Sequence, residues 1–284
     1  MKARLRQMLS ADNSFSENRD IAMYEFGLSR DKHYDVLVVA PGWKPTKIMP
    51  DYDVEITCTK EHSYISGYEV KGDDFLIGWI QCSTGASSLI DELSTCAYLN
   101  FDKMVFVGAV GSLVPEIGLG TLCTPEWSIS GNLANGYLLE DIRQYKPFEK
   151  VYPNDSAFVQ QVVERYPDML QAPVFCTDSI FCEYSHLDFI MSFGAKLIEM
   201  ETSSFYLMAD LMEKPAIALM AVSDNSANGD PLVGRTEEQK RLYNITRKQV
   251  IPKIIMDIAR MRCKDVQSNR PGTVTEQNNR LHAG

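Results

Sequence analysis

The sequence predicts an α/β protein, namely a single domain built as a three-layer α/β/α sandwich around a central mixed, largely parallel sheet. Apolar β-branched runs alternate along the chain with amphipathic segments of helical period, a pattern typical of strands joined by helices. Several of these runs stop directly on glycines, hydroxyls or carboxylates. The 284 residues, 45% of them hydrophobic, are enough to bury a core without disulfides or metals.

Each element of this fold has a local signal. The first strand is predicted over 35–40, where a β-branched run stops at Pro41-Gly42. The segment 87–99 places its apolar residues on one side, as an amphipathic helix does. The polar insertion 131–154 has no assigned structure. Further strands are predicted in a hairpin region over 52–70, over 75–82, 103–107, 174–176, 196–200 and 216–222 and, as shorter pieces, around 120–130, and further helices over 155–166, 185–193, after residue 200 and over 236–262.

The two ends of the chain differ in composition from the middle. Residues 1–33 are polar and charged, and we interpret them as an N-terminal extension with two short helices. Residues 34–263 form the predicted catalytic domain, which no internal repeat or linker divides. The polar stretch 264–284 is expected to be a mobile tail.

The charge of the chain restricts its partners. Lys and Arg number 28 and Asp and Glu 38, so the formal net charge is −10. An acidic surface repels a phosphate backbone, which argues against nucleic-acid binding. No apolar run approaches the ~20 residues of a membrane helix, and no signal peptide is evident. The seven cysteines show no CxxC pair. We therefore expect reduced thiols, a cytoplasmic location and no metal site.

Four of the predicted strands end on residues that suit ligand binding. Because ligands of open α/β sheets bind outside the carboxyl ends of the strands, we expect these clusters to converge on one pocket. Neither GxGxxG nor GxxxxGK[ST] is present, so the glycines predict neither a dinucleotide site nor a P-loop. The four clusters are Pro41-Gly42, Gly108 to Gly111, Glu199-Met200-Glu201 and Ser223-Asp224.

Two carboxylates in these clusters have a chemical interpretation. Glu201 lies where a strand meets a helix start, and an ionised carboxylate can accept two hydrogen bonds from adjacent hydroxyls, as on a ribose. Asp224 follows an apolar strand, and burial would raise its pKa enough to make it a general acid near neutral pH. Each also has a structural interpretation: Glu201 as a carboxylate that only stabilises the helix start, and Asp224 as a turn residue.

The remaining candidates are open at this stage. Lys44 and Lys47 flank the first turn, where they either attract an anion or are solvated surface lysines. Cys82 and Cys176 close two strands and are interpreted as small buried apolar residues, because no histidine is placed to activate them.

The ordered set of motifs resembles the purine nucleoside and uridine phosphorylase family, which includes nucleosidases for methylthioadenosine and adenosylhomocysteine. Ile198-Glu199-Met200-Glu201, followed about twenty residues later by Ala-Val-Ser223-Asp224, carries most of the resemblance. The order and spacing agree over 35–262. The other matching segments are Asp35 to Gly42, Ser83 to Ser88, Val107 to Gly111 and Thr177-Asp178-Ser179.

The resemblance implies a role for each matching residue. Glu201 would bind the ribose 2′ and 3′ hydroxyls, and Met200 would pack beneath the sugar. Asp224 would protonate, or hydrogen-bond to, N7 of a departing purine. The residues that would border the base are Asp178, Ile180, Phe181, Glu199 and Ser223, and the candidates on the phosphate side are Gly42, Lys44, Lys47, Thr84 and Gly108.

The sequence departs from the phosphorylase pattern where phosphate would bind. Phe106 and Ala109 stand where the family usually has an arginine and a Ser or Thr, and the loop after Gly42 carries no arginine. Lys44, Lys47, Thr84 or the Gly42 amide would have to replace them, or water is the nucleophile. Arg235 either closes over the pocket and supports Asp224 or is a solvated helix-start arginine.

We therefore expect an enzyme that cleaves the N-ribosyl bond of a nucleoside with phosphate as acceptor. Two alternatives stay open: a nucleosidase that uses water, and a nucleoside-binding sensor without turnover. A purine is favoured because the Gln and Arg of uridine phosphorylases have no match near 181–187. The resemblance implies neither a metal nor an organic cofactor, and a homo-oligomer, either dimer or hexamer.

Overall fold

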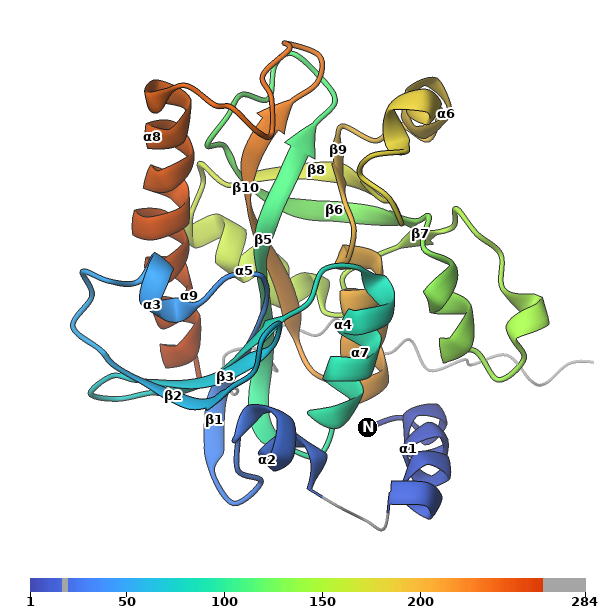
Figure 1. Ribbon diagram of the computed structural model, residues 1–284, viewed down its shortest axis with the longest axis vertical. Coiled ribbons are helices and arrows are strands. Elements are labelled where there is room, and N and C mark those ends of the chain that lie inside the picture. The colour runs from blue at the N-terminus through green and yellow to red at the C-terminus, as the bar shows by residue number, and fades with distance from the viewer. Residues whose placement is uncertain (17–19, 263–284) are drawn as a thin grey trace, which may run out of the picture.

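The central sheet and its flanking helices confirm the predicted fold class. The computed structural model describes residues 1–16 and 20–262, so the predicted tail over 264–284 lies outside the described residues. The described chain is a mixed α/β protein with a central mixed sheet (Figure 1). The strands of this sheet are β1 (His33–Pro41), β2 (Glu55–Glu61), β3 (Ser66–Lys71), β4 (Leu76–Cys82), β5 (Asn100–Ser112), β6 (Leu122–Ser130), β7 (Lys150–Val151), β8 (Leu170–Cys176), β9 (Leu197–Glu199) and β10 (Ala216–Asn225).

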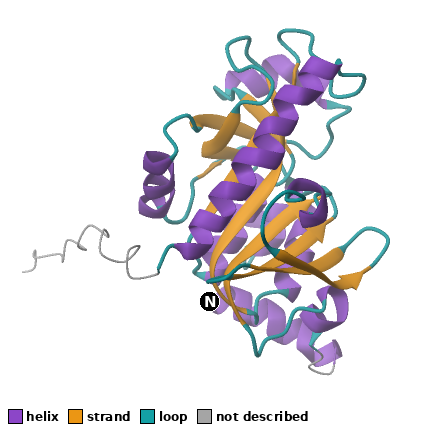
Figure 2. Ribbon diagram, turned by 90° about the vertical axis from the view of Figure 1, so that its left-hand side faces the viewer, coloured by secondary structure: helices purple, strands orange, loops and turns teal. Residues whose placement is uncertain are grey.

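The helices lie on both faces of the sheet (Figure 2). One hydrophobic core packs α1, α2, α4 and α7 against one face, and a second packs α3, α5, α8 and α9 against the other. The helices are α1 (Ala3–Ser16), α2 (Ile21–Phe26), α3 (Pro45–Ile48), α4 (Ala86–Thr95), α5 (Ser156–Arg165), α6 (Leu187–Ser192), α7 (Thr202–Met212), α8 (Glu237–Ile245) and α9 (Ile251–Arg260), with 3-10 turns η1 (Leu133–Leu138), η2 (Ile142–Gln144) and η3 (Glu183–His186) and a π-helical turn η4 (Thr246–Val250).

Strand β1 shows why the sequence has unbroken apolar runs. Its side chains alternate between the two cores: Leu37 and Val39 belong to the first, and Val36 and Val38 to the second. All four are fully buried. A strand covered on both faces needs apolar residues at every position, which is why this segment reads as a continuous run.

The sheet is more strongly antiparallel than the sequence predicts. Strands β4, β1, β5 and β10 lie parallel and side by side, and β6, β8 and β9 form a second parallel group. Antiparallel pairs join β10 to β6, β9 to β5, β3 to both β2 and β4, and β7 to β6. Because β9 returns to β5, the strands β5, β10, β6, β8 and β9 close into a ring. Closure of this kind depends on pairing between distant segments, which local periodicity does not reveal.

Two predicted elements differ in detail. The shorter strands expected around 120–130 are one strand, β6. The single helix expected over 236–262 begins with a capping box at Thr236 and contains the π-helical turn η4 between α8 and α9. Pro252 lies in the first turn of α9 and has no N–H to donate to the preceding turn, which explains why regular α-helical bonding is interrupted there.

The N-terminal residues pack against the rest of the chain. Leu5 and Leu9 of α1 and Phe26 of α2 belong to the first core. The backbone N–H of Lys2 donates to the carbonyl of Leu211 in α7 at 2.7 Å. Helices α1 and α2 therefore extend the helical layer, while the treatment of 1–33 as an extension separate from the domain stays a prediction.

Two further observations concern the described part of the chain as a whole. None of its helices is long and apolar enough to cross a membrane. Its cysteines, six in number, are free thiols.

Candidate functional site

The clusters that follow the predicted strands do converge. A cavity of about 690 Å³ lies at the carboxyl ends of β1, β5, β9 and β10, where the tips of β5 and β10 lie side by side (Figure 1). Its volume lies in the range of small-molecule sites. Of the residues singled out from the sequence, the cavity is lined by Gly42, Thr84, Gly108, Ile180, Phe181, Glu199, Met200, Glu201, Ser223, Asp224 and Arg235.

Glu199 is held entirely by the protein itself. One carboxylate oxygen, Oε2, accepts the backbone N–H groups of Glu201 and Thr202 at 2.7 and 2.8 Å. The other, Oε1, accepts the thiol of Cys176 and the hydroxyl of Thr202, both at 2.8 Å. Four bonds fill the lone pairs of a carboxylate, so none remains for a base. The helix-start role considered for Glu201 belongs to Glu199, which anchors the first turn of α7.

Glu201 is the carboxylate that is open to the cavity. It is only 6% exposed, and its Oε1 accepts the backbone N–H of Gly85 at 2.6 Å. Gly85 has φ +98°, a conformation that L side chains rarely adopt, and this turn precedes helix α4. Burial, with the nearby charge of Glu199, raises the pKa of Glu201 to about 8. Burial also raises the pKa of Glu199, although its hydrogen-bond donors oppose this shift. The empty site therefore holds a proton on Glu201 at neutral pH.

Asp224 reaches the cavity from a local irregularity in β10. The register of β10 against β5 shifts between Val222 and Asp224, and such bulges re-aim side chains. The hydroxyl of Ser223 donates to Asp224 Oδ1 at 2.5 Å. A Cβ at Gly111 would lie 3.0 Å from Asp224 Oδ2, so the glycine makes room for the carboxyl group. Burial raises the pKa of Asp224, against the opposing effects of the Ser223 hydrogen bond and the Arg235 charge.

A third carboxyl group, Glu183, lines the same cavity. It lies in the 3-10 turn η3, is 8% exposed, and its Oε2 has no hydrogen-bond partner among the described residues. Burial, with the charge of Asp224, raises the pKa of Glu183 to about 7. Sequence reasoning missed Glu183, because it follows no strand and belongs to no motif. Only its proximity to the base-pocket segment hinted at it.

The apolar residues of that segment are open to solvent. Ile180 and Phe181 line the cavity but are 48% and 88% exposed. Asp178 does not line it, because its carboxylate accepts the amide of Asn132 at 2.9 Å and the backbone N–H of Leu133 at 3.2 Å. Asp178 thus ties the start of η1 to the end of β8, and the structure does not bring it to a base.

The predicted phosphate side is only partly assembled. Thr84 and Gly108 line the cavity, whereas Lys44 and Lys47 do not. The ammonium of Lys44 is paired with Glu61 at 2.8 Å, and Lys47 is exposed on α3. The backbone N–H of Gly42, a candidate anion donor, donates instead to the carbonyl of Cys82 at 3.0 Å. The structure therefore corrects the prediction that these three groups bind an anion.

Two arginines supply positive charge to the cavity instead. Arg235 was singled out from the sequence, and Arg247 was not. Arg247 lies in the π-helical turn η4, and its guanidinium carbon is 4.9 Å from the ring centroid of Trp43. Arg235 stacks over Tyr243 at 4.6 Å. Both aromatic rings line the cavity too.

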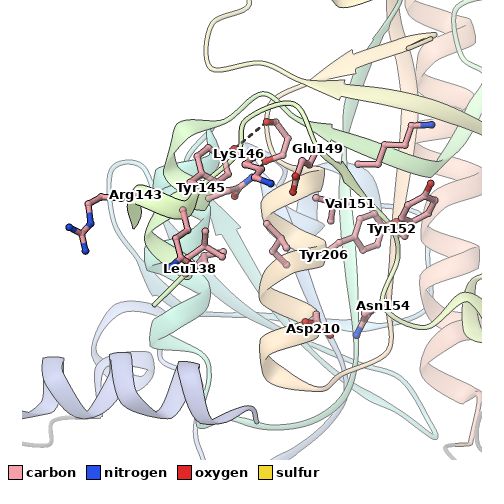
Figure 3. Close-up of a pocket in the computed structure, with 16 residues that line it drawn as sticks. Leu138, Arg143, Tyr145, Lys146, Glu149, Val151, Tyr152, Asn154, Tyr206 and Asp210 are labelled. Carbon is pink, nitrogen blue, oxygen red and sulfur yellow. Dashed lines mark hydrogen bonds between the residues drawn. The ribbon is translucent and has the colours of Figure 1, made fainter. Parts of the chain in front are cut away.

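A larger cavity of about 890 Å³ lies between the polar segment 131–154 and α7 (Figure 3). Its polar groups are mostly bound within the protein: the hydroxyl of Tyr206 accepts the N–H of Ala218 at 3.1 Å, and Asp210 pairs with Lys2 at 2.6 Å. In Figure 3, Arg143 points away from the cavity, and it pairs with Asp141. None of the strand-end clusters singled out from the sequence lines this second cavity.

One group of described residues has metal-ligand spacing. His33, Asp35 and Asp102 could each offer one ligand atom within 4.8 Å of the others. This group lies at the start of β1, whereas the cavity described above lies at the end of that strand. Asp35 already accepts the backbone N–H of Leu76 at 2.8 Å.

Comparison with known proteins decides the family. The family model described as "Phosphorylase superfamily" matches residues 54–251, more than half of the chain. The chain belongs to the phosphorylase superfamily. The resemblance read from the strand-end motifs is thereby confirmed. No curated protein matches the chain.

Solved structures of this superfamily share the fold. Uridine phosphorylase from Vibrio fischeri superposes with a TM-score of 0.64 at 14% identity, over 81% of this chain and 92% of that one. The 5′-methylthioadenosine/S-adenosyl homocysteine nucleosidase of Campylobacter jejuni superposes with a TM-score of 0.59 at 14% identity, over 79% and 98%. At this identity the likeness establishes the fold alone.

Proposed function

We propose that this superfamily member cleaves the N-ribosyl bond of a purine nucleoside, with inorganic phosphate as the acceptor. The observation that carries the proposal is the convergence of Glu201 and Asp224 on one cavity from two different strand ends. One is a carboxyl group suited to a pair of adjacent hydroxyls, and the other is a half-buried acid. Together they fit the two ends of a nucleoside.

Asp224 would act on the leaving base. Its burial favours the neutral acid, which can donate a proton to a ring nitrogen such as N7 of a purine. As the C1′–N bond breaks, its electron pair goes to the base, the proton of Asp224 neutralises it, and an oxygen of phosphate bonds to C1′. A positioned general acid contributes about 10²–10⁴-fold to such a step.

Glu201 would hold the ribose. The 2′ and 3′ hydroxyls are hydrogen-bond donors, and they favour the ionised carboxylate. Because the empty site keeps the pKa of Glu201 at about 8, nucleoside binding near neutral pH would release the proton of this group. Met200 lines the cavity beside it and supplies an apolar surface for the sugar.

Hydrolysis is the second candidate reaction. The observation that favours it is the pair Phe106 and Ala109, which line the cavity where a phosphate site needs donors. In that case a water oxygen would bond to C1′ and its proton would return to Asp224. The structural relatives include a phosphorylase and a nucleosidase, so they do not decide between the two reactions.

Release of free base tests the proposal. Inosine, adenosine, guanosine and uridine are incubated with the protein, with and without phosphate and with EDTA, since no metal or organic cofactor is proposed. We expect purine release that depends on phosphate and is unaffected by EDTA. Release that ignores phosphate supports hydrolysis, and tight binding without release identifies a sensor.

Two variants test the assigned residues. Asp224→Asn should lower turnover by about 10²–10⁴-fold, and Glu201→Gln by about 10–100-fold through the lost charge-assisted bonds to the ribose. Asp210→Asn, the same change on the exposed side of α7 where Asp210 pairs with Lys2, is the control and should retain activity. Full activity of both cavity variants would show that the site is assigned wrongly.

We also propose that the protein is a homo-oligomer, either a dimer or a hexamer. Phe181 lies on the cavity wall with 88% of its surface exposed, an apolar side chain that a neighbouring subunit could cover. Light scattering during gel filtration measures the assembly. A monomer at micromolar concentrations would contradict this proposal.

A further inference from the structure

The cavity contains an arginine that the protein leaves without a partner. Arg247 lines the cavity, and its Nε atom is buried and has no hydrogen-bond acceptor within the described ranges. No carboxylate of the described residues forms an ion pair with it, whereas Arg241, on the preceding helix α8, pairs with Glu238 at 2.7 Å. A buried donor left without an acceptor is costly, so its acceptor is expected from outside the chain.

Aromatic rings fix the orientation of this guanidinium. Its central carbon is 4.9 Å from the ring centroid of Trp43 and 6.0 Å from that of Tyr243. The two rings meet edge to face, with centroids 6.3 Å apart. Stacking satisfies the flat face of a guanidinium but none of its N–H groups, which leaves the donor edge available for a ligand.

The local backbone is built to hold Arg247 there. The turn η4 is π-helical, and such turns occur often at functional sites. Thr246 donates its hydroxyl to the carbonyl of Gly120, and the hydroxyl of Tyr52 donates to the carbonyl of Gln249. The turn is thus tied to other parts of the fold on either side of Arg247, at Thr246 and at Gln249, so the arginine is held in position.

A second cation strengthens the charge at this wall. Arg235 stacks over Tyr243 at 4.6 Å, and its Nε donates to the carbonyl of Leu232 at 3.1 Å. It forms no ion pair with a described carboxylate. The chain carries a net charge of −10, yet this wall of the cavity keeps two arginines without such a partner. Unpaired guanidinium groups in a concave site favour an anion, and their planar fork suits a phosphate.

We propose that Arg247, stacked on Trp43, binds a phosphate group, with Arg235 adding to the attraction. The inference rests on the proposed function, because it deepens the assignment of the same cavity. The phosphate is either the free acceptor or a monoester on the 5′ oxygen of the nucleoside. In the second case the substrate is a nucleoside 5′-monophosphate.

Calorimetric titration of the full chain measures this binding directly and needs no turnover. Inorganic phosphate and adenosine 5′-monophosphate are the probes, and adenosine is the uncharged reference. Arg247→Gln should weaken binding of the phosphate-bearing probe by about 10–100-fold, as loss of a charge-assisted contact does. Arg247→Lys keeps the positive charge but lacks the planar guanidinium. Its affinity for the phosphate-bearing probe should therefore lie between those of Arg247→Gln and the unmodified protein. Arg241→Gln, which removes a charge from the exposed face of α8, should bind like the unmodified protein.

The outcomes separate the two sources of phosphate. Tight binding of inorganic phosphate that Arg247→Gln abolishes supports the free acceptor. A strong preference for adenosine 5′-monophosphate over adenosine, lost in Arg247→Gln, supports the 5′-monoester. Equal affinity of Arg247→Gln and the unmodified protein for both probes, with both folded by thermal melting, overturns the inference. If Asp224→Asn still abolishes base release in that event, the proposed cleavage stands without it.

Discussion

The two sides of the cavity differ in how their charged groups are bound. On the side of β9 and α7, Glu199 accepts four hydrogen bonds from the protein and Glu201 accepts one from Gly85. On the side of η3 and η4, Glu183 Oε2 and Arg247 Nε have no partner among the described residues. We call these the closed side and the open side.

The difference indicates a division of labour. On the closed side, the hydrogen bonds of Glu199 are complete without a ligand and Gly85 orients Glu201, so Glu201 is held in place before a ligand binds. The open side carries unsatisfied donors and acceptors, which only a bound molecule completes. Under the proposed function, the ribose would be bound by Glu201 on the closed side, and other parts of the ligand would complete the contacts of the open side.

The largest expected effect comes from a variant that disrupts the hydrogen bonds of the closed side. Glu199→Gln replaces acceptor lone pairs by an N–H₂ group, which faces donors at Oε1 or Oε2. We expect a loss of about 3 kcal/mol in the free energy of unfolding, or roughly 6–12 °C in melting temperature. Thermal unfolding followed by circular dichroism measures it. Cys176→Ala, which removes one donor and leaves the carboxylate, should cost about 1 kcal/mol. Equal melting of both variants would refute the argument.

The next effect concerns the proton on Glu201. Its pKa is about 8 in the folded protein and 4.5 in the unfolded chain, so the stability that this group contributes is fully present below pH 4.5 and is lost as pH rises to about 8. Glu201→Gln resembles the protonated form and keeps the acceptor for Gly85.

We therefore expect the two proteins to melt alike near pH 5, with the variant the more stable by a few kcal/mol at pH 9. A melting difference that does not change with pH would contradict the assigned protonation.

A smaller effect tests the open side. Glu183, whose pKa is about 7, becomes charged as pH rises through neutrality, beside the acid that would protonate the leaving base. A negative charge there opposes departure of the base with its electron pair. Base release should therefore fall around pH 7 in the unmodified protein, and this fall should move to higher pH in Glu183→Gln. The pH profile of kcat is the measurement, and superimposable profiles would rule out the effect.

The smallest expected effect tests whether Lys44 lies outside the site. Lys44→Gln removes an ammonium that the structure pairs with Glu61 outside the cavity. We expect binding of phosphate to be unchanged and stability to change by less than about 1 kcal/mol, as is usual for an exposed pair. A marked loss of phosphate affinity in calorimetry would return Lys44 to the site.

The contrast also explains what the sequence can and cannot predict. Glu201 and Asp224 were found because each directly follows an apolar strand, and strand ends converge in such folds. Glu183 and Arg247 were missed because a 3-10 turn and a π-helical turn carry them, and neither leaves a periodic pattern. Lys44 was considered as an anion ligand because it is near Gly42 in the chain, and the structure agrees instead with the alternative of a surface lysine.

The prediction of the fold shows the same difference between local and long-range features. Local periodicity predicted most helices and most strands, because burial on one or both faces leaves a pattern in the segment. The antiparallel return of β9 to β5 depends on pairing between distant segments. No window of sequence contains both partners of those contacts.

The pairing of β5 with β10 has a consequence for how the candidate site assembles during folding. Met104 to Ser112 pair with Ala216 to Asn225, more than a hundred residues later in the chain. Contacts of such long sequence separation slow folding, since a large loop must close before they form. Asp224 is placed at the cavity by this pairing, so the base release proposed above should return in the slowest refolding phase, after most helical signal has recovered.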